Sequence, residues 1–371
     1  KALQRYRIPG AITSLVMGAV VAAMGWMHHD PTLELLATFG IVALFLFAGL
    51  EIDLREMRRT PKALATHSIL WLILVSAATW VGTSLFHQPV RVSALLALAL
   101  MTPSAGFILS SLPAFGLKPP EQFAVKTSVI GSELLALAAL FFILQSTSFE
   151  RLILSLAAMV GVVIIIPFAF RAFAVWVAPH APKSEFAFLL MVAVVSAYTT
   201  RKLGVYYLVG AFMVGVAAQQ FRSHLPAMSS EKMIDALESF GSVFIPFYFF
   251  YAGTGIVSEQ LSFEAAGIGV LLLLACIPVR VGVVMLNRRF FSGDTWETGK
   301  RMGSALVPTL VFTLVISSIL QEQFALPDAI AGALILYTVV NTTVPAFILH
   351  SAAPDFESIE ASPVGPPLED G

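Results

Sequence analysis

Apolar runs of about 20 residues recur along the whole chain between short charged or Pro/Gly-rich breaks. A helix needs roughly 20 apolar residues to cross the hydrocarbon core of a bilayer. The pattern therefore predicts an all-α membrane protein with twelve spans. The limits that we expect are 8–28, 33–53, 64–86, 92–113, 121–145, 152–176, 185–200, 203–220, 237–257, 263–287, 300–320 and 328–350.

The composition agrees with a membrane protein. Hydrophobic residues make up 57% of the chain and charged residues 12%, against roughly 45–50% and about 25% in soluble domains. The net charge of −1 argues against a nucleic-acid partner. The single cysteine, Cys276, excludes an intrachain disulfide framework.

Lysine and arginine are distributed unevenly among the predicted connections. Of the 22 basic residues, 16 fall on the side that holds Lys1, Arg5 and Arg7, and four fall on the other. Because cationic loops are retained in the cytoplasm, we expect both ends of the chain to be cytoplasmic. The two basic residues left over, Lys126 and Arg280, lie within spans.

Weak internal repeats link the two halves of the chain. FGIVALFLFAGLEI (39–52) resembles FGSVFIPFYFFYAGTGI (240–256), and 8–28 and 92–113 match 203–220 and 300–320 in the same way. The copies are seven spans apart, and an odd shift places the second copy upside down in the membrane. The span 185–200 then lacks a partner, so we expect one further helix before residue 1.

Two spans are interrupted by proline at matching repeat positions. Pro103 interrupts MTPSAG (101–106), and Pro308, followed by Thr309, interrupts LVPTLVF (306–312). Proline leaves backbone groups unpaired, which at membrane depth is tolerated only against protein or a water-filled cavity. Inverted pairs of broken helices point to the substrate site of a secondary transporter. The alternative is a pair of packed, inert kinks.

Glu133 lies about 12 residues into the span 121–145, roughly 18 Å from its start at 1.5 Å per residue. A carboxylate at that depth usually faces a cavity or a partner and marks an ion or proton path. Ser132 precedes it, and Thr102 and Ser104 flank Pro103. Such oxygens suit a hard alkali cation. The alternatives are a glutamate that only fixes helix packing and hydroxyls that bond to their own helices.

The two basic residues within spans allow two interpretations each. Arg280 lies eight residues before Arg288 and cannot release its proton, so it is either a fixed counter-charge or a side chain that reaches back to the interface. Lys126 lies two helical turns before Glu133 on nearly the same face. It is nearer the end of its span, so reaching the interface is the stronger expectation for it.

Five segments together resemble the cation:proton antiporter superfamily, especially its bacterial Na⁺/H⁺ antiporter (NapA-like) and Kef-type branch. They are LFLFAGLEIDL (44–54), MTPSAGFILSSL (101–112), VIGSELLAL (129–137), YLVGAFMVGV (207–216) and IPFYFFYAGTGI (245–256). The resemblance implies a transporter rather than an enzyme. It also implies an NhaA/NapA-like inverted-repeat fold of thirteen helices with two crossed broken helices, twelve of which lie in this chain.

The resemblance also implies a division into domains. Dimer-domain helices occupy 1–57 and 184–260, core-domain helices occupy 58–150 and 261–350, and a linker helix occupies 151–183. The composition of 351–371, with five acids, four prolines and no basic residue, predicts an acidic, disordered tail. The core is expected to move like an elevator against the dimer domain of a homodimer. Kef-type relatives imply a regulatory domain after residue 371.

The ion-binding acid of the family falls on Glu133, its polar partner on Ser132 and its basic residue on Arg280. The family usually has an aspartate preceded by Asp, Asn or Gln, and this chain has Ser132-Glu133 instead. One acid opposite an arginine favours electroneutral exchange of one Na⁺ or K⁺ for one H⁺. We expect Glu133 to bind the metal ion, no other cofactor, and a bacterial inner membrane as the location.

Two other function classes fit the same broken helices. A sodium-coupled organic-anion symporter would have a roomy polar cavity and two cation sites without a lone titrating acid. A channel or sensor derived from the transporter scaffold would account for the unusual Ser132-Glu133 pair.

Overall fold

The computed structural model describes residues 9–27, 30–52, 61–146, 148–181, 184–202, 207–222 and 231–349. The predicted tail 351–371 lies outside these ranges. Within them the regular structure is helical throughout. The helices are α1 (Gly10–Ala23), α2 (Pro31–Leu50), α4 (Pro61–Ser84), α5 (Val90–Met101), α6 (Ala105–Ser111), α7 (Pro119–Gln145), α8 (Phe149–Ala172), α9 (Glu185–Lys202), α10 (Tyr207–Arg222), α11 (Glu231–Thr254), α12 (Phe263–Phe291), α13 (Trp296–Ala305), α14 (Leu310–Phe324) and α15 (Asp328–Ile348).

Several helices begin at residues whose side chains pair the free amides of the first turn. Asp30 accepts hydrogen bonds from the amides of Thr32 and Leu33 at the start of α2. Ser262 and Thr295 cap α12 and α13 in the same way. Such caps satisfy backbone donors that have no partner within the helix. The polar residues between apolar runs therefore fix where these helices start.

In the part of the chain that the structure describes, fewer helices than the twelve predicted spans have the length and hydropathy of a membrane span. Among the described residues seven helices are long and apolar enough to cross a membrane, or eight if the bent pair α13 and α14 is one span. The predicted spans 8–28 and 203–220 correspond to α1 and α10, which are shorter apolar helices of 14 and 16 residues. Each predicted span nevertheless coincides with a helix or a broken pair of helices.

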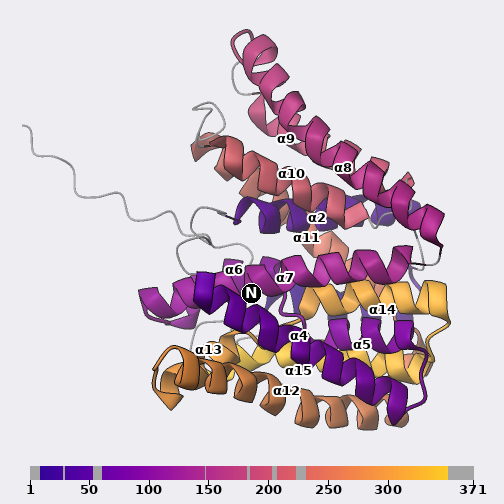
Figure 1. Cartoon of the computed structure of the whole chain (residues 1–371). Coiled ribbons are helices and arrows are strands. Elements are labelled where there is room, and N and C mark those ends of the chain that lie inside the picture. Colours follow the sequence, from indigo (N-terminus) through magenta and orange to yellow (C-terminus); the bar gives the residue numbers. More distant parts are fainter. Residues whose placement is uncertain are drawn as a thin grey trace, which may run out of the picture.

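The helices pack in two groups, which Figure 1 shows one above the other. One group contains α1, α2, α9, α10 and α11, and the other contains α4, α5, α6, α7, α12, α13, α14 and α15. Helix α8 follows α7 and contacts α7, α9 and α10. Glu133, Arg280 and both proline breaks belong to the second group.

Glycines of the repeated segments lie where helices of the first group approach closely. A Cβ atom on Gly49 of α2 would collide with the backbone of Phe212 in α10, and one on Gly215 of α10 would collide with the backbone of Leu46. Gly40 faces the backbone of Phe244 in α11 in the same manner. Small residues at helix interfaces allow the close backbone approach on which packing between membrane helices depends.

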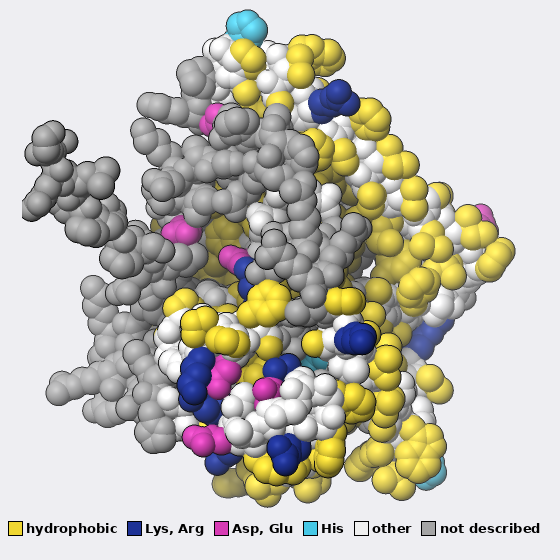
Figure 2. All heavy atoms as spheres, turned by 60° about the vertical axis from the view of Figure 1, so that its left-hand side comes forward, with side chains coloured by type: hydrophobic (Ala, Val, Ile, Leu, Met, Phe, Trp, Pro, Cys, Tyr) yellow, Lys and Arg dark blue, Asp and Glu magenta, His cyan; other side chains and the backbone are white. Residues whose placement is uncertain are grey.

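Large apolar side chains cover much of the outer surface. Figure 2 shows a broad face on which hydrophobic side chains predominate, next to a group of charged ones. On α8, for example, Leu154, Ile165 and Phe168 are each more than 60% exposed. An exposed apolar surface of this kind fits contact with lipid rather than with water.

Candidate functional site

The two proline breaks meet inside the second group. Residues 102–104 separate α5 from α6, and residues 306–309 separate α13 from α14, whose axes differ by 49°. The amide of Ser104 donates to the carbonyl of Pro308 at 2.9 Å. Thr313 also donates from α14 to the carbonyl of Ala99 in α5 at 2.6 Å. Backbone freed at one break is therefore paired with backbone at the other.

Glu133 reaches this crossing from α7. Its side chain is 4% exposed, and its Oε2 accepts a hydrogen bond of 2.8 Å from the amide of Ala105, the first residue of α6. A carboxylate that accepts from a backbone amide makes a strong, charge-assisted hydrogen bond. The acid predicted to bind an ion thus lies directly at a helix break.

The predicted hydroxyl ligands are buried beside this break. Ser104 precedes Ala105, and both Thr102 and Ser104 are at most 1% exposed. Thr102 Oγ1 makes no hydrogen bond to any described residue. A buried hydroxyl usually has a partner, so an oxygen without one is suited to hold a ligand.

Thr309, the residue predicted to follow the second break, is held by α15. Its amide donates to Oδ1 of Asn341 at 3.2 Å, and Nδ2 of Asn341 donates to its hydroxyl at 2.9 Å. Both residues are fully buried. This side-chain amide fixes the start of α14, and nothing in the local sequence pattern predicted it.

Arg280 binds the second break on the side where α13 ends. Its guanidinium donates to the carbonyls of Val307 and Leu306 at 2.6 and 2.7 Å, and to the hydroxyl of Tyr337 at 3.2 Å. Tyr337 in turn donates to the carbonyl of Leu100, next to the first break. Arg280 is 6% exposed, so it does not reach back to the interface. Its structural partner is the carbonyl end of α13.

Lys126 has a partner that the sequence did not indicate. Its ammonium lies 3.0 Å from a carboxylate oxygen of Glu51, at the end of α2. Both side chains are partly exposed, at 30% and 47%. The ion pair joins α7 of the second helix group to α2 of the first.

His67 of α4 is a second site residue that was not predicted from the sequence. Its Nε2 lies 3.0 Å from the hydroxyl oxygen of Ser132, which is fully buried. The histidine stands near the start of a predicted span, where such residues are common. On the inner face of α4, His67 lies at helical spacing between two apolar residues, Leu64 and Trp71. A polar residue within an apolar stripe was the signal that the sequence offered.

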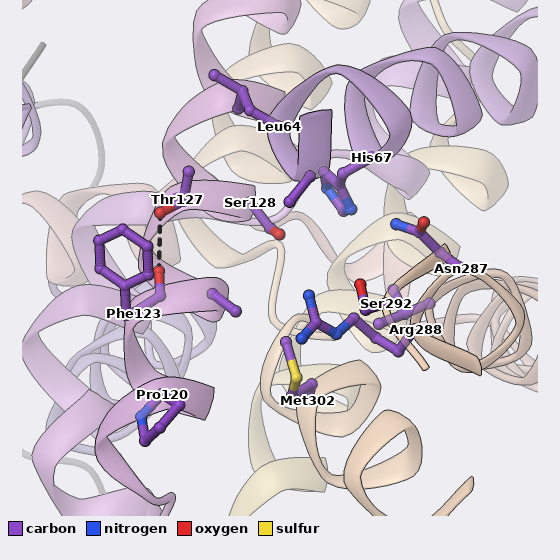
Figure 3. A pocket seen from close by; sticks show the side chains of 13 residues that line it. Leu64, His67, Pro120, Phe123, Thr127, Ser128, Asn287, Arg288, Ser292 and Met302 are labelled. Atoms are coloured by element: carbon purple, nitrogen blue, oxygen red, sulfur yellow. Dashed lines mark hydrogen bonds between the residues drawn. The ribbon is translucent and has the colours of Figure 1, made fainter. Parts of the chain in front are cut away.

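A cavity of about 240 Å³ extends from this histidine toward the ends of three helices. Figure 3 shows side chains of α4 above it, those of α7 on the left and those of α12 on the right. Polar lining residues are His67, Thr127, Ser128, Asn287, Arg288 and Ser292. Arg288 is paired with Asp294, since its Nε donates to the carboxylate at 2.7 Å. The charge at this end of the cavity is therefore largely balanced.

The chain matches the family model described as "Sodium/hydrogen exchanger, transmembrane" over residues 1–352. This chain belongs to the sodium/hydrogen exchanger family. The family is one of transporters, and the exchanger is a multi-pass integral membrane protein.

Individual relatives cover nearly the whole exchanger. The Na⁺/H⁺ antiporter of Enterococcus hirae is 21% identical over 93% of this chain and 92% of its own length. The Na⁺/H⁺-K⁺ antiporter GerN of Bacillus cereus is 21% identical over 95% and 92%. The structure of the sodium proton antiporter MjNhaP1 from Methanocaldococcus jannaschii superposes with a TM-score of 0.70 at 15% identity, covering 94% and 92%. That likeness shows a shared fold.

Removing the guanidinium of Arg280 will destabilise the exchanger. The Arg280→Met variant leaves the carbonyls of Leu306 and Val307 unpaired inside the protein, at a cost of about 2 kcal/mol or more. Thermal unfolding of the purified protein measures the loss. Arg91→Met is the matched control, because Arg91 also donates to a carbonyl, that of Ser146, but on the exposed surface. Equal melting temperatures for the two variants would contradict the role of Arg280.

Proposed function

We propose that this exchanger moves one monovalent cation, Na⁺ or K⁺, in exchange for one H⁺, and that Glu133 binds both in turn. The observation that carries the proposal is the buried Glu133 carboxylate at the crossing of the two breaks, bonded to the amide of Ala105. A buried ionised group is costly unless it is paired. Either a proton or an alkali cation can neutralise it, and the two compete for the same oxygens.

The neighbouring oxygens support a cation at this place. Ser132 is adjacent to Glu133, and Thr102 and Ser104 lie at the break whose next residue, Ala105, contacts the carboxylate. Among the described residues no three His, Cys, Asp or Glu side chains gather in a group that could hold a metal ion. Carboxylate and hydroxyl oxygens favour a hard, weakly bound cation that can leave again.

Arg280 supports exchange of equal charges. Guanidinium is protonated at all relevant pH values, and here it is bound to the carbonyls of Leu306 and Val307. It therefore neither carries a proton nor leaves its place at the helix end. With Glu133 as the single exchanging group, one positive charge moves in each direction.

The cavity supplies a path for water and ions. It is lined by His67, which contacts Ser132, and by Ser128, one helical turn before Ser132. Its other end lies at the start of α7 and the end of α12, on the side that the distribution of basic residues assigns to the cytoplasm. We therefore assign this conformation to the state open toward the cytoplasm.

We further propose that the two helix groups move against each other. The group with α1, α2, α9, α10 and α11 would form the dimer domain, and the group that carries Glu133 would form the moving core. The packing of helices within each group supports this division. Twelve spans, an inverted repeat, a homodimer in a bacterial inner membrane and a cytoplasmic C-terminus with a regulatory domain beyond residue 371 complete the proposal.

Loss of the Glu133 carboxylate should abolish exchange. In proteoliposomes a Na⁺ or K⁺ gradient should drive proton movement by the wild type, and Glu133→Gln should reduce it to the background of empty vesicles. Glu121→Gln is the matched control, since Glu121 is a buried acid on the same helix that pairs with Arg301 instead. It should retain exchange. A Glu133→Gln variant that exchanges at the wild-type rate places the site elsewhere.

The proposed stoichiometry predicts that membrane potential does not drive exchange. Proteoliposomes with the same Na⁺ and K⁺ gradients in both arms should reach the same pH gradient whether or not valinomycin is added to impose a potassium diffusion potential, because no net charge crosses the membrane. An internal pH dye measures this, with Na⁺ as substrate. A pH gradient that grows or shrinks with the imposed potential rules out one-for-one exchange.

Relative motion of the two helix groups should be stopped by joining them at Lys126 and Glu51. A short thiol-specific bifunctional reagent applied to Lys126→Cys/Glu51→Cys should arrest exchange, and a cleavable reagent should allow recovery on reduction. Glu121→Cys/Arg301→Cys is the control, because this pair lies within one group. Continued exchange in the fully cross-linked Lys126/Glu51 protein contradicts the elevator motion.

A further inference from the structure

His67 is placed between the cavity and the proposed ion site. Its ring lines the cavity together with Leu64 of the same helix, as Figure 3 shows. Its Nε2 lies 3.0 Å from the buried hydroxyl of Ser132, 65 residues away in sequence. Helix α4 packs against α7, so the contact depends on the fixed spacing of these two helices.

The contact with His67 determines where the hydroxyl hydrogen of Ser132 points and which of its lone pairs stay free. A serine hydroxyl has one hydrogen and two lone pairs. In a helix this hydrogen is usually donated to the backbone carbonyl one turn earlier, as Thr127 does to Phe123 at 2.8 Å on the same helix α7. Ser132 instead has an imidazole nitrogen within hydrogen-bond distance. When Nδ1 of His67 carries the ring proton, Nε2 accepts the hydrogen of Ser132.

A cation binds to oxygen lone pairs, so the direction of the Ser132 hydrogen matters. With the hydrogen held by His67, the lone pairs of Ser132 remain for a cation next to Glu133. Without that acceptor, the hydroxyl can rotate back to its own helix, and its lone pairs lose their fixed orientation. Ligands that are held by a second layer of hydrogen bonds bind metal ions more tightly.

We propose that His67 is a positioning residue that orients the hydroxyl of Ser132 toward the transported cation and thereby sets the affinity and selectivity among alkali ions. This proposal rests on Glu133 as the ion site. The side chain that contacts Ser132 also borders the cavity.

The test measures cation binding directly, without turnover. The melting temperature of the purified full-length protein is followed at alkaline pH while LiCl, NaCl or KCl is added, with choline chloride as the control for ionic strength. A ligand that binds only the folded state stabilises it by RT ln(1 + L/Kd), where L is the ligand concentration, so a cation that binds more tightly raises the melting temperature more at the same concentration. The titrations give an apparent Kd for each cation and variant.

We expect His67→Leu to raise the apparent Kd of the preferred cation about threefold to tenfold, the range that one ordinary hydrogen bond supports. The ratio of the Na⁺ and K⁺ affinities should change as well. His67→Gln should stay within about twofold of the wild type, because the oxygen of its amide can accept from Ser132 in place of Nε2. A merely structural role for His67 does not predict this rescue.

A double-variant comparison completes the test. Ser132→Ala should weaken binding, and His67→Leu/Ser132→Ala should bind no more weakly than Ser132→Ala alone, because the two residues act through one hydroxyl. The proposal is overturned if His67→Leu binds like the wild type, if His67→Gln binds as weakly as His67→Leu, or if the two single effects multiply in the double variant.

Glu133→Gln in the same titration separates this proposal from the proposed function. If Glu133→Gln and the wild type bind the cation equally well, Glu133 is not the ion site, and both proposals fail. If Glu133→Gln abolishes binding while His67→Leu binds like the wild type, only the role of His67 is refuted.

Discussion

Backbone groups that proline breaks leave without helical partners must be paired inside the protein, because a membrane interior offers them no water. This constraint shapes the centre of the exchanger. The amide of Ser104 is paired with the carbonyl of Pro308 across the two breaks, and Arg280 pairs the carbonyls of Leu306 and Val307. The breaks therefore stabilise each other, and the surrounding helices are held in the positions that this pairing requires.

The same pairing separates the roles of the two buried charges. Amide ends of a broken helix attract negative charge, and carbonyl ends attract positive charge. Glu133 lies at an amide, that of Ala105, whereas Arg280 lies at carbonyls. The carbonyl end is thus occupied by a permanent positive charge, the guanidinium of Arg280. In the proposed function, the counter-charge of the Glu133 carboxylate at the amide end is exchanged between a proton and a cation.

Much of this arrangement was predictable from local properties of the chain. Apolar runs of about 20 residues located the helices, and Pro103 and Pro308 located both breaks. Glu133 was recognisable because a carboxylate is rare in so apolar a segment. Hydropathy and proline are features of single positions or short windows, so they need no knowledge of packing. Twelve spans were predicted in the same way, and over the described residues α1 and α10 are shorter apolar helices than the others.

The partners of these residues were decided by tertiary structure. Lys126 pairs with Glu51 across 75 positions, and His67 approaches Ser132 across 65. A side chain in a membrane span has many possible neighbours, and the sequence of that span does not determine which helix packs beside it. The sequence by itself determined the helices, their breaks and the position of Glu133 and Arg280 within apolar spans. Only the packing of helices distant in the chain decided that Glu133 faces a helix amide and that Arg280 binds carbonyls. The same packing brings His67 to Ser132. These contacts depend on distances in space, which the order of residues does not give.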